Sequence, residues 1–263
     1  MSRSLGRDVH IYDTNDPATV LGGLILSNGI TNANFYSMVE IIFIFDSDYF
    51  LRDANGIIVQ RDNHPFHPGN YYILTNGSMT INNEPWLVRA ISVTTGPVLH
   101  HFAMMSAREI GNAAHIFPLA YEGHWMEHNY SHWITIQPST GGPINSVQNG
   151  MLLTADAHAL FDSYKVSINP DDNYKIVCFD GDGLGVGGRH LDQQLLRDDR
   201  RPVDQVLRWH FRQAVLANMK GAGEPVFEND FPPGSDMIGE ILDGPKAAER
   251  MEFELFTRLA GVT

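Results

Sequence analysis

The sequence predicts an α+β protein with a β-rich beginning, a mixed middle and a helical end. Short β-branched and aromatic runs, separated by turn residues, fill the first part of the chain, as expected for short strands. Strand-like runs and one short helix alternate in the middle, and helix patterns dominate after residue 190. These patterns divide the chain into a β-rich region 1–88, a central region 89–180 and a helical region 181–263.

The composition is that of a globular protein. The chain has 263 residues, of which 43% are hydrophobic, so a sizeable core is available. A single cysteine, Cys178, excludes disulfides and cysteine-based zinc sites within one chain. The first residues lack the apolar run of a secretory signal, and no apolar stretch approaches the roughly 18 residues of a membrane helix. We therefore expect an intracellular protein, in the cytoplasm or nucleus, without a membrane partner.

The charge of the chain is acidic and unevenly distributed. The formal net charge is −13, whereas a nucleic-acid-binding protein normally carries a basic balance. Residues 189–220 nevertheless contain seven Arg and Lys against four Asp. A solvated helix face is the favoured interpretation of this cluster, and a local basic face stays open.

The N-terminal region contains several strand-like runs and one hairpin signal. Asn76-Gly77 favours a two-residue type I′ turn, because that turn needs positive φ at both positions. We therefore expect the flanking runs 71–74 and 78–81 to pair. The other expected strands are residues 9–12, 40–45, 56–60 and 87–93.

The central region carries the residues with the most informative spacing. Thr154 is a suitable N-cap for a short helix over 155–163. His158 and Asp162 stand four residues apart, so both project from one face of that helix. A histidine and a carboxylate at this spacing can hold a divalent ion about 2.0–2.2 Å from each ligand. His115 lies in an apolar, strand-like run that ends at Pro118.

The remaining segments predict structure rather than chemistry. Two strand runs flank a turn over 165–179, which indicates a β-hairpin with Cys178 in its core. Residues 183–188 fit G-x-G-x-x-G, but they follow a hairpin instead of opening a βαβ unit, so we expect a turn. Helices are expected over 202–220 and 245–260, each followed by a glycine.

The chain has a histidine in a strand-like run (His115), then Asn149, and then a helix histidine nine residues later (His158). This order resembles that of the HNH endonuclease family. The runs AAHIFP (113–118) and NGMLLTADAHALFD (149–162) are similar to patterns of HNH-domain proteins of fungi, A-A-H-I-x-P and N-G-L-L-L-x-x-x-x-H-x-L-F-D. ISVTTG (91–96) is similar to the strand and turn that open that domain. The resemblance implies a ββα-metal (HNH) core with a β-rich N-terminal layer and a helical C-terminal layer.

The resemblance also implies roles for particular residues in metal-dependent hydrolysis of phosphodiester bonds in nucleic acid. His115 would be the general base, and Asn149 would be the catalytic-site residue that ties the loop before the helix to the strand of His115. His158 and Asp162 would hold the metal. Many HNH nucleases have a further ligand just before the base, where this chain has Ala114. Two protein ligands suit Mg²⁺ or Mn²⁺ better than zinc, because Mg²⁺ keeps several waters.

A loop of about 30 residues, from 119 to 148, is the expected substrate-contacting element. It places His124, His128 and His132 at successive spacings of four, where they could meet a transition metal or phosphates. Trp125 and Trp133 could stack on bases. The simpler interpretation is a partly buried aromatic loop with exposed histidines.

A second function, from another class, stays open. The chain could be an HNH-like scaffold without nuclease activity, which binds a small molecule or catalyses a biosynthetic step near His115 and residues 121–133. The acidic charge and Ala114 favour this alternative, whereas the presence of all four expected site residues favours the nuclease. Nothing in the sequence specifies an oligomeric state.

Overall fold

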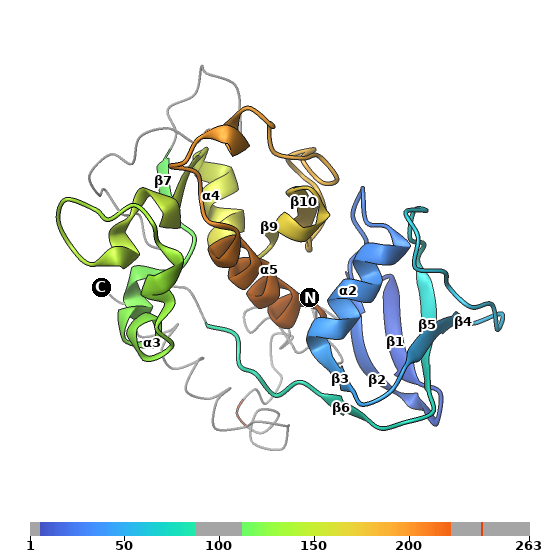
Figure 1. Cartoon of the computed structure of the whole chain (residues 1–263). Coiled ribbons are helices and arrows are strands. Elements are labelled where there is room, and N and C mark those ends of the chain that lie inside the picture. The colour runs from blue at the N-terminus through green and yellow to red at the C-terminus, as the bar shows by residue number, and fades with distance from the viewer. Residues whose placement is uncertain (1–5, 88–111, 222–237, 239–263) are drawn as a thin grey trace. The chain divides into compact units, whose positions relative to one another are not determined.

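The computed structural model describes residues 6–87, 112–221 and 238 (Figure 1). Asp8–Ala222 form one compact unit, and the described residues outside it are Gly6, Arg7 and Ile238. The compact unit contains both helices and strands, with most N-terminal strands following one another, which confirms the α+β class. The expected helix over 245–260 and, except for Leu87, the expected strand over 87–93 lie outside the described residues.

A four-stranded sheet organises the N-terminal region, with the strand order β2-β1-β5-β4. The outer pairs β1–β2 and β4–β5 are antiparallel, and the central pair β1–β5 is parallel. The expected strand over 9–12 is confirmed as β1. The strands are β1 (Val9–Asp13), β2 (Asp16–Leu24), β4 (Tyr49–Asp53) and β5 (Gly69–Thr75).

A helix precedes β3, which forms a separate two-stranded sheet with β6. Helix α2 (Asn32–Ile42) begins at a capping box, in which Thr31 and Asn34 bond each other's backbone N–H groups. The expected strand over 40–45 is therefore wrong in its first half, and only β3 (Phe43–Phe45) is extended. The reason is helical spacing: Phe35, Met38, Val39 and Ile42 are buried on one face of α2.

The expected hairpin at Asn76-Gly77 is also wrong. Strand β6 (Met79–Ile81) pairs with β3, and neither turn residue has a positive φ. The Asp46 carboxylate accepts hydrogen bonds from the backbone N–H and the hydroxyl of Ser78, each at 2.8 Å, and so directs the chain toward β3. Residues 56–60 form a loop with one isolated bridge, not the expected strand.

The central region contains two strands followed by a helix. Strand β7 (Asn112–His115) pairs antiparallel with β8 (Gly150–Leu153), and helix α4 (Ala155–Asp162) contacts both. Thr154 caps α4, as predicted, by accepting a hydrogen bond from the Ala157 N–H. The predicted hairpin is confirmed as β9 (Val166–Asn169) and β10 (Lys175–Cys178).

The segment between β7 and β8 contains five short helical turns, and residues 134–142 between them are irregular. Its longest turn is α3, and the others are 3₁₀ helices. They are η1 (Leu119–Tyr121), α3 (Glu122–Glu127), η2 (Tyr130–Trp133), η3 (Pro143–Asn145) and η4 (Val147–Asn149).

Helix α5 (Asp204–Met219) joins the two hydrophobic clusters that the described residues form. Twelve of its sixteen residues are buried. Val206 and Leu207 belong to the cluster of β7, β8 and α4, whereas Val215 and Leu216 belong to the cluster of the four-stranded sheet and α2. Figure 1 shows α5 between these elements. This part of the expected helical layer is thus a core element and not an outer layer.

Two further segments match their expected structural roles. Asp182 accepts hydrogen bonds from the backbone N–H groups of Val186 and Gly187, which folds the glycine-rich segment into a turn. Gly188 has φ +78°, and a Cβ there would lie 2.7 Å from the Cα of Gly29, so close backbone approach explains these glycines. Burial raises the pKa of the Cys178 thiol to about 12, as suits a core residue.

Among residues 6–87, 112–221 and 238, none of the helices is both long and apolar enough to cross a membrane.

Candidate functional site

His115 is the last residue of β7, where it pairs with Gly150 of β8. It is half-buried, and its neighbour Ala114 is fully buried among the apolar side chains of the core. Because successive side chains of a strand point to opposite faces, His115 lies on the face away from that core. The methyl group of Ala114 therefore fills core space and offers no ligand atom.

Asn149 connects the backbone that follows His115 to the backbone before β8. Its fully buried side-chain oxygen accepts a hydrogen bond from the Phe117 N–H at 2.8 Å. Its amide nitrogen donates to the carbonyl oxygens of Phe117 at 3.0 Å and Ile144 at 2.8 Å. Three bonds to two segments fix the backbone on both sides of the site.

His158 and Asp162 meet on α4. The His158 Nε2 and an Asp162 carboxylate oxygen lie 3.2 Å apart, and the two side chains are 12% and 8% exposed. A nitrogen and a carboxylate thus converge on a helix that packs against both strands. This donor set fits a divalent cation that completes its coordination with water or substrate oxygens.

The aromatic residues of the 119–148 segment divide between core and surface. Trp125 is 1% exposed, its indole N–H donates to the Ser131 hydroxyl at 3.0 Å, and its ring meets Phe117 edge-on. It is therefore a core residue, and its ring faces are covered rather than open to a base. Trp133 is half-buried and stacks on Tyr130 with centroids 4.1 Å apart.

Two of the three regularly spaced histidines come together. The rings of His124 and His128 stack at 3.9 Å, and Glu127 joins them so that one ligand atom from each lies within 4.8 Å of the others. Burial, and next the neighbouring His128, lower the pKa of His124. His132 is outside this group, and its Nδ1 bonds the Asn129 carbonyl oxygen. Glu127 was not predicted as a ligand from the sequence, although the order H-x-x-E-H is visible there.

The arginines after residue 189 are largely neutralised. Arg201 pairs with Asp204, and Arg208 makes a two-bond contact with Asp171. The other pairs are Arg200 with Asp198 and Arg212 with Glu84. Four of the seven basic residues counted in 189–220 thus have an acidic partner, which weakens the expectation of a basic face.

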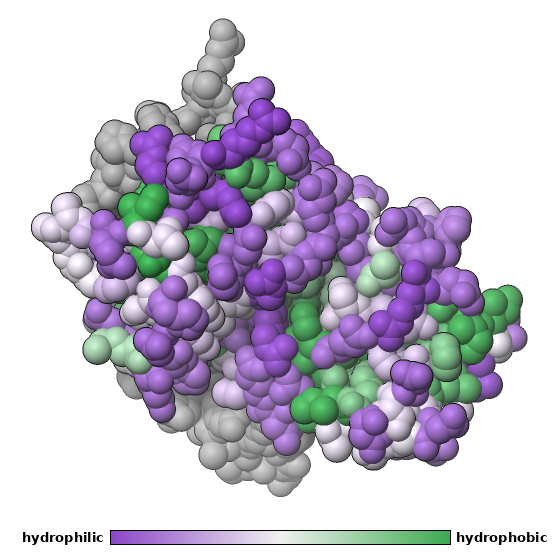
Figure 2. Space-filling view, in the orientation of Figure 1, coloured by the Kyte–Doolittle hydropathy of each residue, from purple (hydrophilic) through white to green (hydrophobic). Residues whose placement is uncertain are grey.

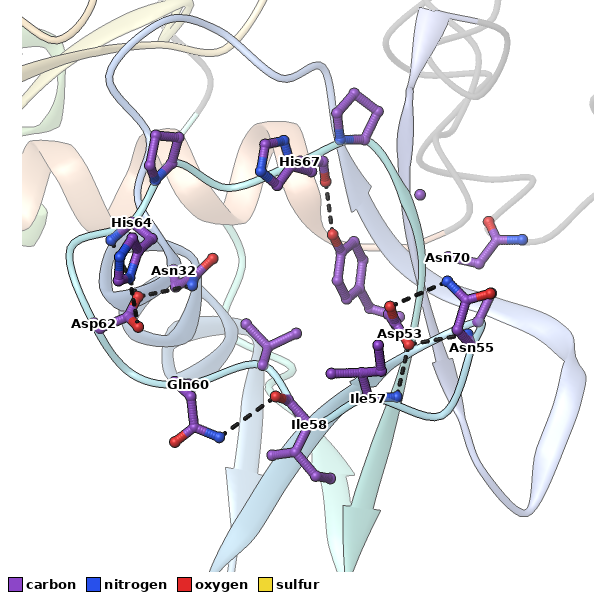
Figure 3. Close-up of a pocket in the computed structure, with 16 residues that line it drawn as sticks. Asn32, Asp53, Asn55, Ile57, Ile58, Gln60, Asp62, His64, His67 and Asn70 are labelled. Atoms are coloured by element: carbon purple, nitrogen blue, oxygen red, sulfur yellow. Dashed lines mark hydrogen bonds and ion pairs between the residues drawn. The ribbon is translucent and has the colours of Figure 1, made fainter.

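A cavity of about 470 Å³ lies in the N-terminal region, outside the residues expected to carry chemistry (Figure 3). The carboxylates that line this cavity bond to residues of the surrounding loop. Asp53 accepts from the N–H groups of Asn55 and Ile57, and Asp62 contacts both His64 and Asn32 at 2.8 Å. A hydrogen bond from His64 lowers the pKa of Asp62.

A second cavity of about 700 Å³ lies beside β3 and β4, where Ile44 and Phe50 are more than half exposed. Figure 2 shows a mostly hydrophilic face on which hydrophobic side chains gather over the N-terminal region.

The comparisons with known proteins divide the chain in a similar way. Residues 93–169 match the model of the HNH endonuclease family, and residues 6–80 match a family described as a domain of unknown function (DUF8573). No curated protein and no solved structure matches the chain. The first match confirms the resemblance to HNH endonucleases and supports a nuclease of the hydrolase class. It spans His115, Asn149, His158, Asp162 and the α3 segment.

Proposed function

We propose that the protein is a metal-dependent endonuclease that hydrolyses phosphodiester bonds of nucleic acid. The observation that carries this proposal is the His158–Asp162 contact of 3.2 Å, on a helix that packs against the strand of His115. Both elements lie within the residues that match the HNH endonuclease family. The arrangement of β7, β8 and α4 is the order expected of a ββα-metal core.

In this mechanism the chain's own residues position and activate a water molecule. His115 accepts the proton of the attacking water, because imidazole is the side chain that most often serves as a general base. Asn149 is a positioning residue, since its bonds to Phe117 fix the backbone two residues after His115. His158 and Asp162 bind the cation.

The cation, when bound, neutralises charge on the scissile phosphate and stabilises the leaving oxygen. Ala114 contributes no ligand, so two protein side chains hold the ion and water or phosphate oxygens supply the rest. Mg²⁺ and Mn²⁺ suit this site because Mg²⁺ is commonly held by one or two side chains. Zinc prefers three or four protein ligands.

The charge distribution supports a second candidate, an HNH-like scaffold without nuclease activity that binds a small molecule near His115 and residues 121–133. Affinity for nucleic acid comes largely from phosphate contacts with Lys and Arg. The net charge of −13 and the acidic partners of Arg201, Arg208 and Arg212 reduce that attraction.

Plasmid DNA and single-stranded RNA, each incubated with Mg²⁺ or Mn²⁺ and then with a chelator, test the proposal. We expect cleavage with either ion and none with the chelator. The His115→Ala substitution removes the base and lowers the rate about 10²–10⁴-fold. His67→Ala is the matched control, because His67 is an exposed histidine of the N-terminal region.

Two outcomes would count against the proposal. Cleavage that survives both His115→Ala and His158→Ala contradicts the assigned site. Absence of cleavage with every ion, in a protein shown to be folded, favours the scaffold without nuclease activity.

A further inference from the structure

We infer that His124, Glu127 and His128 form a second metal site, for a transition-metal ion of the Zn²⁺ type, separate from His158 and Asp162. The inference depends on the geometry of α3 and on no step of the nuclease reaction. In the part of the chain that the structure describes, these three side chains are the ones whose ligand atoms converge as a group.

The first argument is distance. One ligand atom from each of the three residues lies within 4.8 Å of the other two. Ligand atoms about 2.0 Å from a tetrahedral zinc ion lie about 3.3 Å apart, so the side chains need to close by about 1.5 Å at most. Glu127 and His128 are exposed and can make this movement by side-chain rotation.

The second argument is the orientation of a ring. The Nδ1 of His128 lies 2.9 Å from the carbonyl oxygen of His124, and since a carbonyl only accepts, Nδ1 carries the proton. In the neutral ring the lone pair is then on Nε2. Histidines that bind metals commonly have their other nitrogen bonded in this way, which fixes the tautomer and the ring orientation.

The third argument is the support under the ligands. Trp125, between the ligand residues, is buried, and its indole N–H is bonded to Ser131. His124 packs with Phe117, at a centroid distance of 6.2 Å. The backbone of the turn is thus anchored to the core while two of the three ligands face solvent.

The donor set selects the ion. Two imidazoles and one carboxylate are typical of zinc sites with three protein ligands, in which a water or another ligand takes the fourth position. The order H-x-x-E-H also places two histidines four residues apart, a spacing at which zinc is held on one helix face. Mg²⁺ prefers oxygen ligands and is a poor competitor here.

A competition titration of the metal-free full chain with Zn²⁺ against a chromophoric chelator tests the inference. We expect this site to bind one equivalent, with an affinity that falls about 100-fold in His128→Ala and at least about tenfold in Glu127→Gln. His132→Ala is the matched control, because His132 is an exposed histidine of the same segment outside the group. Its affinity for Zn²⁺ should equal that of the wild type.

Circular dichroism first establishes that each variant is folded. The decisive variants change exposed residues, so they test the site even where His124→Ala is unstable. Co²⁺ in place of Zn²⁺ should give the intense visible absorption of a tetrahedral site, which is lost in His128→Ala. The inference is overturned if His128→Ala and His132→Ala bind Zn²⁺ equally, or if His158→Ala removes this equivalent instead. Because no readout is a cleavage rate, failure here leaves the proposed nuclease untouched.

Discussion

The two groups of proposed metal ligands both lie in the region that matches the HNH endonuclease family, but in opposite environments. On α4, His158 and Asp162 are 12% and 8% exposed, and their helix packs against β7 and β8. On α3, Glu127 and His128 are exposed, and the helix is only six residues long. The α4 pair is thus buried among packed elements of the domain, whereas Glu127 and His128 of the α3 group lie on its surface.

The two environments impose different free-energy costs on metal binding: desolvation for the buried pair and side-chain ordering for the exposed group. The α4 pair is held in place by the fold, and its carboxylate, largely withdrawn from water, has His158 as a partner. In the α3 group, Glu127 and His128 keep their hydration, and these exposed side chains must instead become ordered when an ion binds. We therefore expect the α4 pair to be sensitive to any change in the fold, and the α3 group to be removable without unfolding.

The largest expected effect is on cleavage, at the α4 pair. His158→Ala removes one of two protein ligands and should lower the cleavage rate by about 10²-fold or more at low Mg²⁺. Asp162→Asn keeps the shape but removes the charge, so a higher Mg²⁺ concentration should restore part of its rate. Initial rates over a range of Mg²⁺ concentrations measure both effects, with His67→Ala as the control. A Mg²⁺ dependence identical to the wild type in both variants would place the ion elsewhere.

The next expected effect is on stability. It concerns the hydrogen bonds that hold the backbone near each group, those of Asn149 and that of Ser131. Asn149→Ala leaves buried backbone groups of Phe117 and Ile144 without their partner and should reduce the free energy of unfolding by about 3 kcal/mol. Ser131→Ala removes one bond, to the Trp125 indole, and should cost about 1 kcal/mol. Urea denaturation of both variants gives the two values. Equal losses would mean that α3 is as deeply integrated as the β7–β8 frame.

The sequence predicted the α4 side of this comparison well because its signals are local. Thr154 is a cap that acts on the helix immediately after it, and the spacing of His158 and Asp162 determines that they meet once the helix forms. Asn149 is the exception, because its partner Phe117 lies 32 residues away, and its role was implied by the family resemblance rather than by a local signal. Where a residue's contacts are close in sequence, its position can be predicted without knowing the tertiary contacts.

The N-terminal sheet was predicted less well because its partners are distant in sequence. Asn76-Gly77 carries the strongest local turn signal, yet Asp46 bonds Ser78 and directs the following strand to β3. The run 40–45 has β-branched composition, but its first residues continue a helix that starts at a capping box with Asn34 in the place of the usual Glu or Gln. A tertiary contact overrode the local turn signal in the first case, whereas in the second a local helix signal outweighed the β-branched composition.

The α3 segment was predicted less well than α4 and better than the N-terminal region. Its histidine spacing was visible, but spacing alone does not tell which aromatic faces the core, and Trp125 proved to be buried while Trp133 is half-buried. A stripe of three histidines would require a continuous helix through residue 132. Helix α3 ends at Glu127, and Asn129 adopts a left-handed conformation, with φ 54°. This break separates His132 from the other two histidines.

The smallest expected effect is local protection by each ion, measured by amide hydrogen exchange of peptides covering 122–133 and 155–162. At a free Zn²⁺ concentration ten times the dissociation constant, mass action should slow exchange in the α3 peptide about tenfold, because opening this turn then requires release of the ion. The α4 peptide should be unchanged by Zn²⁺ and slowed by Mg²⁺, since two protein ligands leave most positions to water, as Mg²⁺ prefers and zinc does not. In Glu127→Gln only the Zn²⁺ effect should weaken. Equal slowing of both peptides by one ion would show a single shared site, and the distinction between the buried pair and the exposed group would then be lost.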